Sequence, residues 1–415
     1  MKIIIISATA PPEPLTASRI NWDLADHLAK DENEVWLISP KPSRPLSVKY
    51  PKLKGIIVNN ISDNFTHVRV DSFTYPKYNC LCRAYESLDF GIKSISYVNK
   101  RIKDCDLIYT SSWPLFSQLM IAILRKNKNI PLIMNIQDLY PESFLIKIKC
   151  KILSMLFAPL FFIDKLVARK STHLTVISES QKRVYTEKRK IPESKISLIQ
   201  NWQDPDEFIN FSGSKEDIIT KYNIRESAEK FIYMYLGNIG PVAGVETILQ
   251  SFSLINNDRS FLIIAGSGSA KDKCKLLAQK LGIINIVFLD VPPELRSVVE
   301  LQSVSDVLLL PINPEAAASS IPSKLIAYMF SRKPVISSAP RNSDTSDAIK
   351  TSGCGWITRT NDTNEWADIM DLALKTDKAT LHKMGESGFD YAISNYSKNE
   401  GLKMLSRLIY NIKVN

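Results

Sequence analysis

The sequence contains few of the residues from which simple metal and catalytic sites are built. Among its 415 residues are four histidines and six cysteines, and the cysteines are scattered along the chain. Cys80 and Cys82 are close together, but no second cysteine pair or histidine cluster would complete a zinc site. No histidine lies in a metal-binding or G-x-S-x-G motif. We therefore expect no bound metal and a reduced, cytoplasmic protein.

Long apolar runs and nucleic-acid-binding motifs are missing as well. The apolar run at residues 3–6 is too short for a signal sequence and is expected to form a buried strand. The sequence has no zinc-finger, RNP or basic-aromatic motif, which argues against nucleic acid as a partner. The formal net charge of +10 favours an anionic partner, such as a phosphorylated ligand or an anionic lipid, and it equally suits a basic solvated surface.

Short apolar runs alternate with longer amphipathic stretches, a pattern typical of βα units around a parallel sheet. Most of these runs are continuous rather than alternating, as expected for strands that are covered on both faces. The predicted strands are residues 2–7, 34–39, 106–111, 131–138, 174–178 and 196–200 in the first half, and 231–237, 261–266, 286–290, 306–311 and 334–338 in the second.

The two series of strands indicate two domains, since a chain of this length is too long for one ordinary core. We predict a first domain over residues 1–201, a linker over 202–212, a second domain over 213–383 and a helical segment over 384–415 that packs back on the first domain. Two doubly wound sheets of this kind bind ligands beyond the carboxyl ends of their strands, so both would face a central cleft. Asp204-Pro205-Asp206 lies in the linker and is interpreted as a turn or helix cap rather than a metal-binding D-x-D motif.

Residues 144–170 combine lysines with a long apolar stretch. The apolar stretch is shorter than the roughly 20 residues that span a bilayer. Its composition suits a basic amphipathic helix in a membrane interface, with Lys147, Lys149 and Lys151 towards anionic lipid. A core helix whose lysines reach solvent would have the same composition. The first interpretation predicts a peripheral protein at the inner membrane.

Two glycine-containing turns follow predicted strands. Gly237-Asn238-Ile239-Gly240 would let a ligand approach the backbone closely. Gly266-Ser267-Gly268 suits a turn beside a phosphate or ribose, and a plain tight turn explains it equally well. The third glycine of a dinucleotide-binding fingerprint is replaced by Lys271, so the sequence gives little support to an NAD-dependent oxidoreductase.

The strongest local signal is the segment from Ser320 to Lys324. Pro322 and Ser323 suit the start of a helix, where the serine hydroxyl could satisfy a free backbone amide. A helix start beside a lysine is a natural site for a diphosphate. The alternative is an ordinary helix cap with a solvated Lys324.

Taken in order, these motifs resemble those of family 4 glycosyltransferases, which have the α/β GT-B fold of two Rossmann-like domains. More narrowly they resemble WbuB-like L-fucosamine transferases of bacterial surface-polysaccharide synthesis. The resemblance covers almost the whole chain and is carried by residues 10–14, 135–143, 176–178, 199–202, 236–240, 265–268, 305–307, 310–311, 322–325, 328 and 333–335.

The resemblance implies a retaining, metal-independent transfer from a nucleotide-diphosphate sugar to a polyprenyl-diphosphate-linked acceptor. The donor would be UDP-linked L-FucNAc or a similar N-acetylated 6-deoxyhexosamine. The diphosphate would be bound by Gly237, Asn238 and Gly240 in one turn and by Ser320, Ser323 and Lys324 at the helix start. Gly266 and Gly268 would border the nucleoside.

The resemblance also points to an acceptor-side residue in the first domain. Asp138, at the end of a predicted strand, would orient the acceptor or accept its proton. A carboxylate that caps the following turn is the alternative interpretation of Asp138. Glu142 is a weaker candidate for the catalytic role.

The sequence departs from the family pattern at four positions. The two family glutamates are replaced by Ser319 and Ala327, the arginine after the first glycine is Asn238, and the lysine before the helix glycine is Ala243. These losses leave open a second class of function, a non-catalytic GT-B partner or scaffold protein. They also make Lys324 the remaining cation that the pattern places beside the diphosphate.

Overall fold

The computed structural model describes residues 1–44, 48–51, 53–75, 79–102, 104–111, 115–125, 129–145, 157–241, 243–255, 258–291, 294–312 and 321–414. The chain forms two compact units. The first consists of Met1–Asn201 and Gly401–Asn415, and the second of Trp202–Glu400.

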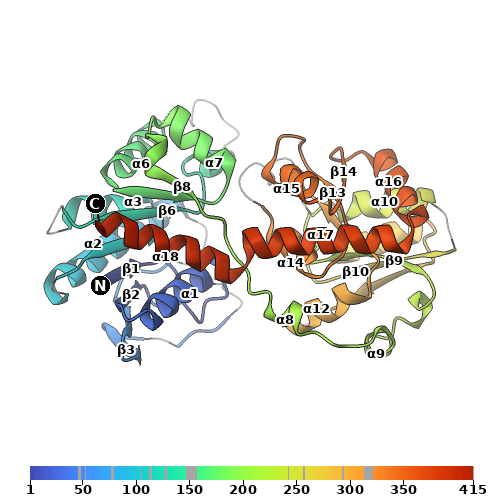
Figure 1. Cartoon of the computed structure of the whole chain (residues 1–415), viewed down its shortest axis with the longest axis horizontal. Coiled ribbons are helices and arrows are strands. Elements are labelled where there is room, and N and C mark those ends of the chain that lie inside the picture. Colours follow the sequence, from blue (N-terminus) through green and yellow to red (C-terminus); the bar gives the residue numbers. More distant parts are fainter. Residues whose placement is uncertain are drawn as a thin grey trace. The chain divides into compact units, whose positions relative to one another are not determined.

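The first unit is built on an eight-stranded sheet in the order β3-β4-β2-β1-β5-β6-β7-β8. Its neighbouring strands are parallel except for the antiparallel pair β3 and β4. Ile3, Ile4 and Ile5 of the central strand are fully buried, since helices cover both faces (Figure 1). The strands are β1 (Lys2–Ile6), β2 (Glu34–Ser39), β3 (Ile57–Ser62), β4 (Phe65–Arg69), β5 (Leu107–Ser111), β6 (Leu132–Ile136), β7 (His173–Val176) and β8 (Ile196–Leu198).

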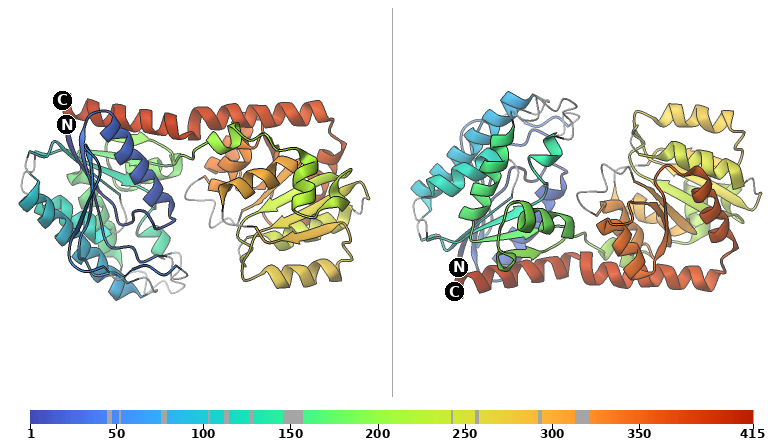
Figure 2. Two further views of the ribbon diagram at one scale, coloured as in Figure 1. Left: turned by 90° about the horizontal axis from the view of Figure 1, so that it is seen from below. Right: turned by 90° about the horizontal axis from the view of Figure 1, so that it is seen from above.

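The helices of the first unit follow its strands in the βα manner that the sequence pattern predicts (Figure 2). They are α1 (Thr16–Lys30), α2 (Cys80–Arg101), α3 (Leu115–Leu124), α4 (Glu142–Leu145), α6 (Ala158–Lys170), α7 (Glu179–Arg183), the π-helix η1 (Val184–Lys188) and the 3-10 turn η2 (Glu193–Lys195). The last helix, α18 (Lys398–Val414), returns to this unit, where the Tyr410 hydroxyl donates to the Asp31 carboxylate over 3.1 Å.

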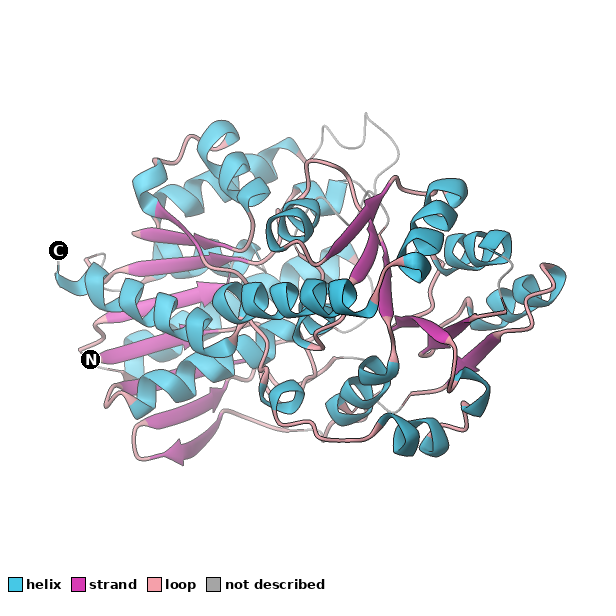
Figure 3. Cartoon of the chain, turned by 45° about the vertical axis from the view of Figure 1, so that its right-hand side comes forward, coloured by secondary structure: helices cyan, strands magenta, loops and turns pink. Residues whose placement is uncertain are grey.

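The second unit contains a six-stranded sheet in the order β11-β10-β9-β12-β13-β14, and all its neighbouring strands are parallel. Helices lie on both of its faces (Figure 3). The strands are β9 (Phe231–Leu236), β10 (Ser260–Ala265), β11 (Ile286–Leu289), β12 (Val307–Pro311), β13 (Val335–Ser338) and β14 (Gly355–Thr358).

Each face of the second sheet has its own apolar core. Helices α12, α14, α15 and α17 contribute to the core on one face, and α10, α11 and α16 to the core on the other. The helices are α8 (Asp206–Ile209), α9 (Lys215–Lys221), η3 (Arg225–Ser227), α10 (Val245–Ile255), α11 (Lys271–Lys280), α12 (Leu295–Val304), α14 (Ser323–Phe330), α15 (Asp344–Ser352), α16 (Thr363–Lys375) and α17 (Lys378–Tyr396).

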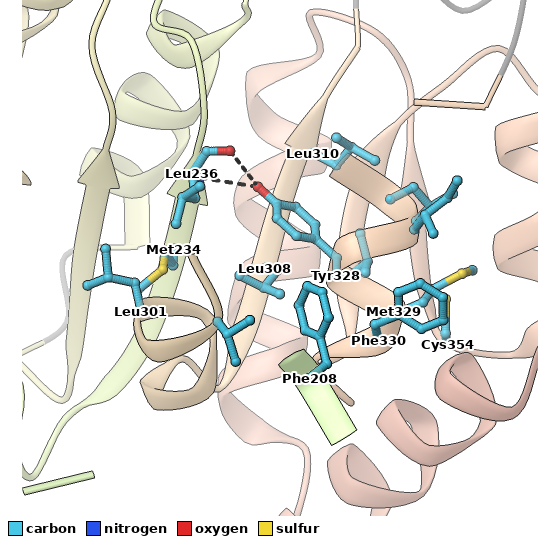
Figure 4. Close-up of a cluster of buried hydrophobic side chains, with 14 of the residues drawn as sticks. Phe208, Met234, Leu236, Leu301, Leu308, Leu310, Tyr328, Met329, Phe330 and Cys354 are labelled. Atoms are coloured by element: carbon cyan, nitrogen blue, oxygen red, sulfur yellow. Dashed lines mark hydrogen bonds between the residues drawn. The ribbon is translucent and has the colours of Figure 1, made fainter. Parts of the chain in front are cut away.

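This architecture confirms the predicted fold class, α/β with two Rossmann-like domains. The predicted strands all form, and three others, β3, β4 and β14, are added to them. The boundary between the units falls after Asn201, so residues 202–212, which are predicted as a linker, are grouped with the second unit. Phe208 anchors them there, because its ring packs 5.7 Å from that of Phe330 in the core shown in Figure 4.

The predicted C-terminal segment is divided between the units. Residues 384–400 belong to the second unit, and the part that belongs to the first unit begins at Gly401. The reason lies in close packing along α17. A Cβ at Gly388 would lie 2.7 Å from that of Cys354, and Phe389, Ala392 and Tyr396 are part of the second unit's core.

The candidate membrane segment is described in part. Residues 146–156, including Lys147, Lys149 and Lys151, lie outside the described residues. Residues 158–170 form α6, in which Asp164, Val167 and Ala168 are buried and Phe162 is 68% exposed. Within the described part of the chain, no helix is long and apolar enough to cross a membrane.

Candidate active site

In the second sheet the order in which successive strands are added reverses between β9 and β12. The chain runs from β9 to β10 and β11 on one side, then crosses to β12, β13 and β14 on the other. In doubly wound sheets ligands bind at such a point, beyond the carboxyl ends of the strands. The Gly237–Gly240 turn directly follows β9, and α14 is the next described helix after β12. Two of the predicted diphosphate-binding segments therefore lie at the switch point of this sheet.

The two glycine turns interlock through their backbones. The Gly237 amide donates to the Ala265 carbonyl over 2.9 Å, and the Ile239 amide donates to the Ser267 carbonyl over 2.8 Å. Gly268 has a φ of +153°, and a Cβ there would lie 2.6 Å from the carbonyl carbon of Ile239. Gly266, with a φ of +135°, is packed in the same way against Gly237. Both glycines are thus required by packing, and their predicted contact with a nucleoside stays a prediction.

Lys324 extends along the carboxyl edge of the sheet to Tyr235. Its Nζ donates to the Tyr235 hydroxyl over 2.7 Å and lies 4.4 Å from the centre of the tyrosine ring. Tyr235 belongs to the core on the α10 face, whereas α14, which carries Lys324, packs on the opposite face. Gly237 makes this crossing possible, because a Cβ at Gly237 would collide with Cε and Nζ of Lys324.

The Lys324 ammonium is partly buried, and no described residue supplies a compensating charge. Burial lowers the pKa of Lys324 from 10.5 to about 8, and no neighbouring carboxylate opposes this shift. Among the described residues, Tyr235 is the hydrogen-bond partner of Nζ, and no acidic side chain pairs with it. The Tyr235 hydroxyl in turn donates to the Asn238 carbonyl over 2.6 Å. This arrangement favours the binding of an anion beside Lys324.

Helix α14 begins at Ser323, and no described side chain caps its first turn. Pro322 occupies the N-cap position, so the prediction that the Ser323 hydroxyl caps the helix is wrong. The Ser323 side chain is exposed, and its carbonyl accepts a hydrogen bond of 2.7 Å from the Gln203 amide. The free amides of an uncapped first turn are available to an anion. Ser320 and Ser319 lie outside the described residues.

Tyr328 fixes α14 to the end of β9. Its hydroxyl lies 3.2 Å from the Leu236 amide and 3.3 Å from the Leu236 carbonyl (Figure 4). Both contacts are buried, and burial raises the pKa of Tyr328. One face of α14 therefore holds the β9 turn in place. Ala327, which replaces a family glutamate, is partly buried beside Tyr328 in the same helix.

Lys271 ties the second glycine turn to β11. Its buried ammonium donates to the Gly266 carbonyl over 3.0 Å, to the Leu289 carbonyl over 3.1 Å and to Asp290 over 2.6 Å. This ion pair lowers the pKa of the exposed Asp290 carboxyl. The lysine that breaks the dinucleotide fingerprint thus stabilises the turn through its side chain.

A small pocket lies beside the Gly237–Gly240 turn. Its volume is about 170 Å³, less than the roughly 300 Å³ at which ligand sites begin, and neither Lys324 nor Tyr235 lines it. It therefore holds at most part of a ligand. The lining residues are Gly240, Pro241, Gly244, Val245, Glu246, Thr247, Ala270, Cys274, Pro311, Ile312, Ser338 and Asn361.

In the first unit, Asp138 follows β6 on a loop whose start is held in place. Gln137 and Asn201 exchange hydrogen bonds of 3.1 and 2.9 Å between their side-chain amides. The Gln181 amide donates to the Gln137 carbonyl over 3.3 Å. The Asp138 side chain is exposed at this anchored position. Its predicted role towards an acceptor stays a prediction.

Glu142, the weaker catalytic candidate, is engaged in an ion pair. Both of its carboxylate oxygens accept hydrogen bonds of 2.8 Å from Arg189. Arg189 also donates to Asp164 over 2.6 Å, and Asp164 accepts from the Tyr185 hydroxyl over 2.9 Å. Glu142 lies at the far end of the loop that carries Asp138, and its ion pair with Arg189 gives it a structural role.

Sequence reasoning missed Tyr235, Lys271 and Arg189. Tyr235 belongs to an apolar strand, so the sequence pattern does not mark it as a site residue. The one local signal is that its hydroxyl-bearing side chain lies just before a glycine turn. Arg189 has no local signal, because its partners lie 25 and 47 residues away. Among the described residues, no group of three or more histidine, cysteine, aspartate or glutamate side chains could hold a metal ion.

Comparisons with known proteins agree with this geometry. Residues 17–207 match the family described as Glycosyltransferase Family 4, and residues 214–390 match Glycosyl transferases group 1. A probable glycosyltransferase of Pseudomonas aeruginosa, WbjE, is 23% identical over 358 residues, which is 85% of this chain and 86% of the relative.

Solved structures share the fold over the full length. Anabaena HepE in complex with UDP has a TM-score of 0.71 at 14% identity, with 99% of this chain and 100% of HepE covered. WaaG, a glycosyltransferase involved in lipopolysaccharide biosynthesis, has a TM-score of 0.65 at 14% identity, with 98% and 99% covered.

Proposed function

The chain is a family 4 glycosyltransferase with the GT-B fold, and from this premise we propose which sugar transfer it performs. It transfers a sugar, with retention of configuration and without a metal ion, from a UDP-linked donor to a saccharide carried on polyprenyl diphosphate. The sugar is an N-acetylated 6-deoxyhexosamine of the L-FucNAc type. The product serves the synthesis of O-antigen or capsule.

The observation that carries this proposal is the Lys324 ammonium at the switch point of the second sheet. During sugar transfer negative charge develops on the departing diphosphate, and preorganised cations and amides stabilise it without reorganisation. Lys324, the uncapped start of α14 and the Gly237–Gly240 turn supply such groups on a single unit. The structure of HepE with UDP supports a uridine donor, and the role of WaaG supports a product in surface-polysaccharide synthesis.

On the acceptor side we assign Asp138 as the residue that orients the acceptor hydroxyl or accepts its proton. Its carboxylate is exposed on the loop that follows β6, and both carboxylate oxygens of Glu142 accept hydrogen bonds from Arg189. A positioned base of this kind contributes roughly 10²-fold to 10⁴-fold to a rate. Replacement Asp138→Asn should therefore lower kcat strongly and leave the affinity for UDP unchanged.

The experiment that tests the proposal is a donor and acceptor panel. Purified protein is incubated with UDP- and GDP-linked sugars and a synthetic polyprenyl-diphosphate saccharide, and product mass is followed with and without EDTA. We expect the acceptor to gain one sugar from one UDP donor, with the donor's anomeric configuration, at equal rates in both conditions. If no donor gives a product and UDP leaves the melting temperature unchanged, the proposal fails.

The membrane association belongs to the same proposal and has its own test. Residues 144–170 would dock on anionic lipid through lysines 147, 149 and 151. We expect binding to anionic liposomes that weakens with salt and with charge reversal at these three lysines. Binding that is absent, or that does not respond to either change, contradicts it.

A further inference from the structure

Among the described residues, no anion accompanies the Lys324 ammonium in the second unit. Moving an ammonium out of water without a paired charge is costly, and the group relieves that cost by releasing its proton. Among the described residues, Nζ contacts the hydroxyl and ring of Tyr235 and lies beside Gly237, where a Cβ would collide with it; neither residue carries a negative charge. Lys324 therefore loses its proton more readily than a solvated lysine does.

The titratable groups around Lys324 do not change this balance. Tyr235 on β9 faces the ammonium directly, and burial raises the pKa of its hydroxyl. Tyr328 on α14 and Cys274 on α11 lie near Tyr235, and burial raises the pKa of each of them as well. The two tyrosine hydroxyls therefore stay neutral between pH 7 and pH 9, and the Cys274 thiol is neutral at pH 7. Among the described residues, no acidic or basic side chain makes an ion pair with Lys324.

We propose that the donor diphosphate supplies the counter-charge that Lys324 lacks, so that diphosphate binding draws a proton from the buffer onto Nζ. The inference rests on the proposed function, because it takes the donor to be a nucleoside diphosphate. It adds that the site is loaded by the diphosphate and a proton together. The bound anion then holds Lys324 charged before the sugar leaves.

Tyr235 acts as the positioning residue for this event. Its hydroxyl accepts from Nζ and donates to the Asn238 carbonyl, so its lone pair stays directed at Lys324. The ring supplies a second, electrostatic contact to the same ammonium. Removing the hydroxyl alone should make the ammonium less stable and leave the ring contact in place.

The test is calorimetric titration of the full chain with UDP at several pH values, each in two buffers with different ionisation enthalpies. The second phosphate pKa is about 6, so UDP itself is almost fully ionised from pH 7.5 upward. With Lys324 at about 8 in the free protein, proton uptake should rise from about 0.2 per UDP at pH 7.5 to about 0.9 at pH 9. Over the same range Kd should weaken about eightfold.

Four variants sharpen the measurement. Lys324→Met should bind UDP weakly and without proton uptake, and Lys324→Arg should retain binding with no uptake, since arginine stays charged. Tyr235→Phe should move the midpoint of uptake to lower pH. Lys333→Met is the matched control, because Lys333 follows α14 at the opposite end and burial also lowers its pKa. It should behave as the wild type does.

The outcomes separate the two proposals. UDP binding at pH 9 without proton uptake overturns this inference and leaves the proposed function intact. The same holds if Lys324→Met retains the uptake, or if Lys333→Met abolishes it. Absence of UDP binding at every pH overturns the proposed function itself.

Discussion

Two cations, one in each unit, have opposite surroundings. Arg189 in the first unit is surrounded by the carboxylates of Asp164 and Glu142. Although burial by itself lowers the pKa of Arg189, its hydrogen bonds and charge attraction to these groups raise it. Lys324 in the second unit has a tyrosine as its neighbour, and burial lowers its pKa to about 8.

The difference separates a structural charge from one that we propose to be functional. Arg189, at the end of η1, donates hydrogen bonds to Asp164 of α6 and to Glu142 at the start of α4, and so joins these three elements. Lys324 lies at the carboxyl edge of a sheet, and no described side chain compensates its charge, which lowers stability and favours an anionic ligand.

Replacement Arg189→Met should destabilise the first unit by about 3–5 kcal/mol, because it leaves the buried Asp164 carboxylate without a cation. The measurement is urea denaturation. Arg183→Met is the control, since Arg183 is exposed on the adjacent helix α7 and its loss should change stability by no more than about 0.5 kcal/mol. Equal losses in the two variants would show that Arg189 is no more structural than a surface arginine.

Replacement Lys324→Met should lower the rate of sugar transfer by roughly 10²-fold or more, which corresponds to about 2.7 kcal/mol of transition-state stabilisation. It should also raise the melting temperature at pH 7, because it removes a charge that burial disfavours. Initial rates and thermal melts check the two effects. A variant with near-normal turnover would exclude Lys324 from the mechanism, and a lower melting temperature would contradict its electrostatic description.

Replacement Gly268→Ala should cost about 2 kcal/mol and weaken UDP binding, because the new Cβ meets the backbone of Ile239. Gly282→Ala is the matched control. Gly282 also has a positive φ, of +67°, but a Cβ there would point into open space. The Gly282→Ala variant should therefore lose only the stability that the left-handed backbone conformation costs an alanine. If the two variants lose the same stability and bind UDP equally, the interlocked turns do not shape the site.

Replacement Glu142→Gln should have the smallest effect, a loss of about 1 kcal/mol, because Arg189 keeps its bond to Asp164. Sugar transfer should continue at a comparable rate if Asp138 is the acceptor-side residue. Denaturation and initial rates measured on the same preparation test both statements. A fall in rate as large as that of Asp138→Asn would return the catalytic assignment to Glu142.

The sequence predicts most of the framework, for reasons that are local. The continuous apolar runs of β1 and β9 identify buried parallel strands, and Gly237 marks the turn after β9. Strand β3 is missed because it lies at the sheet edge, where polar residues such as Asn59 and Asn60 hide the pattern. Strand β4 is largely buried, but Thr66 and His67 interrupt its apolar run. Strand β14 is short and contains a glycine at its start.

The site is predicted less completely, because its side chains are brought together by the fold. Lys324 and Tyr235 are 89 residues apart in sequence, and neither carries a signal that names the other. The capping role of Ser323 was wrong because Pro322, rather than the serine, takes the N-cap position. A sequence motif predicts the first residue of a helix only to within one or two positions. Which side chain caps the helix, and which backbone amides stay free, depends on that exact first residue.

The interlocked glycine turns have a consequence for how donor preference can evolve. The Gly237 and Ile239 amides bond to the carbonyls of Ala265 and Ser267, so the contacts that join the turns are made by backbone atoms. The side chains of Asn238 and Ser267, by contrast, are exposed on this frame. Mutation can therefore alter these two side chains without dismantling the loop geometry. We therefore expect substitutions at Asn238 and Ser267 to change donor binding more than they change the fold.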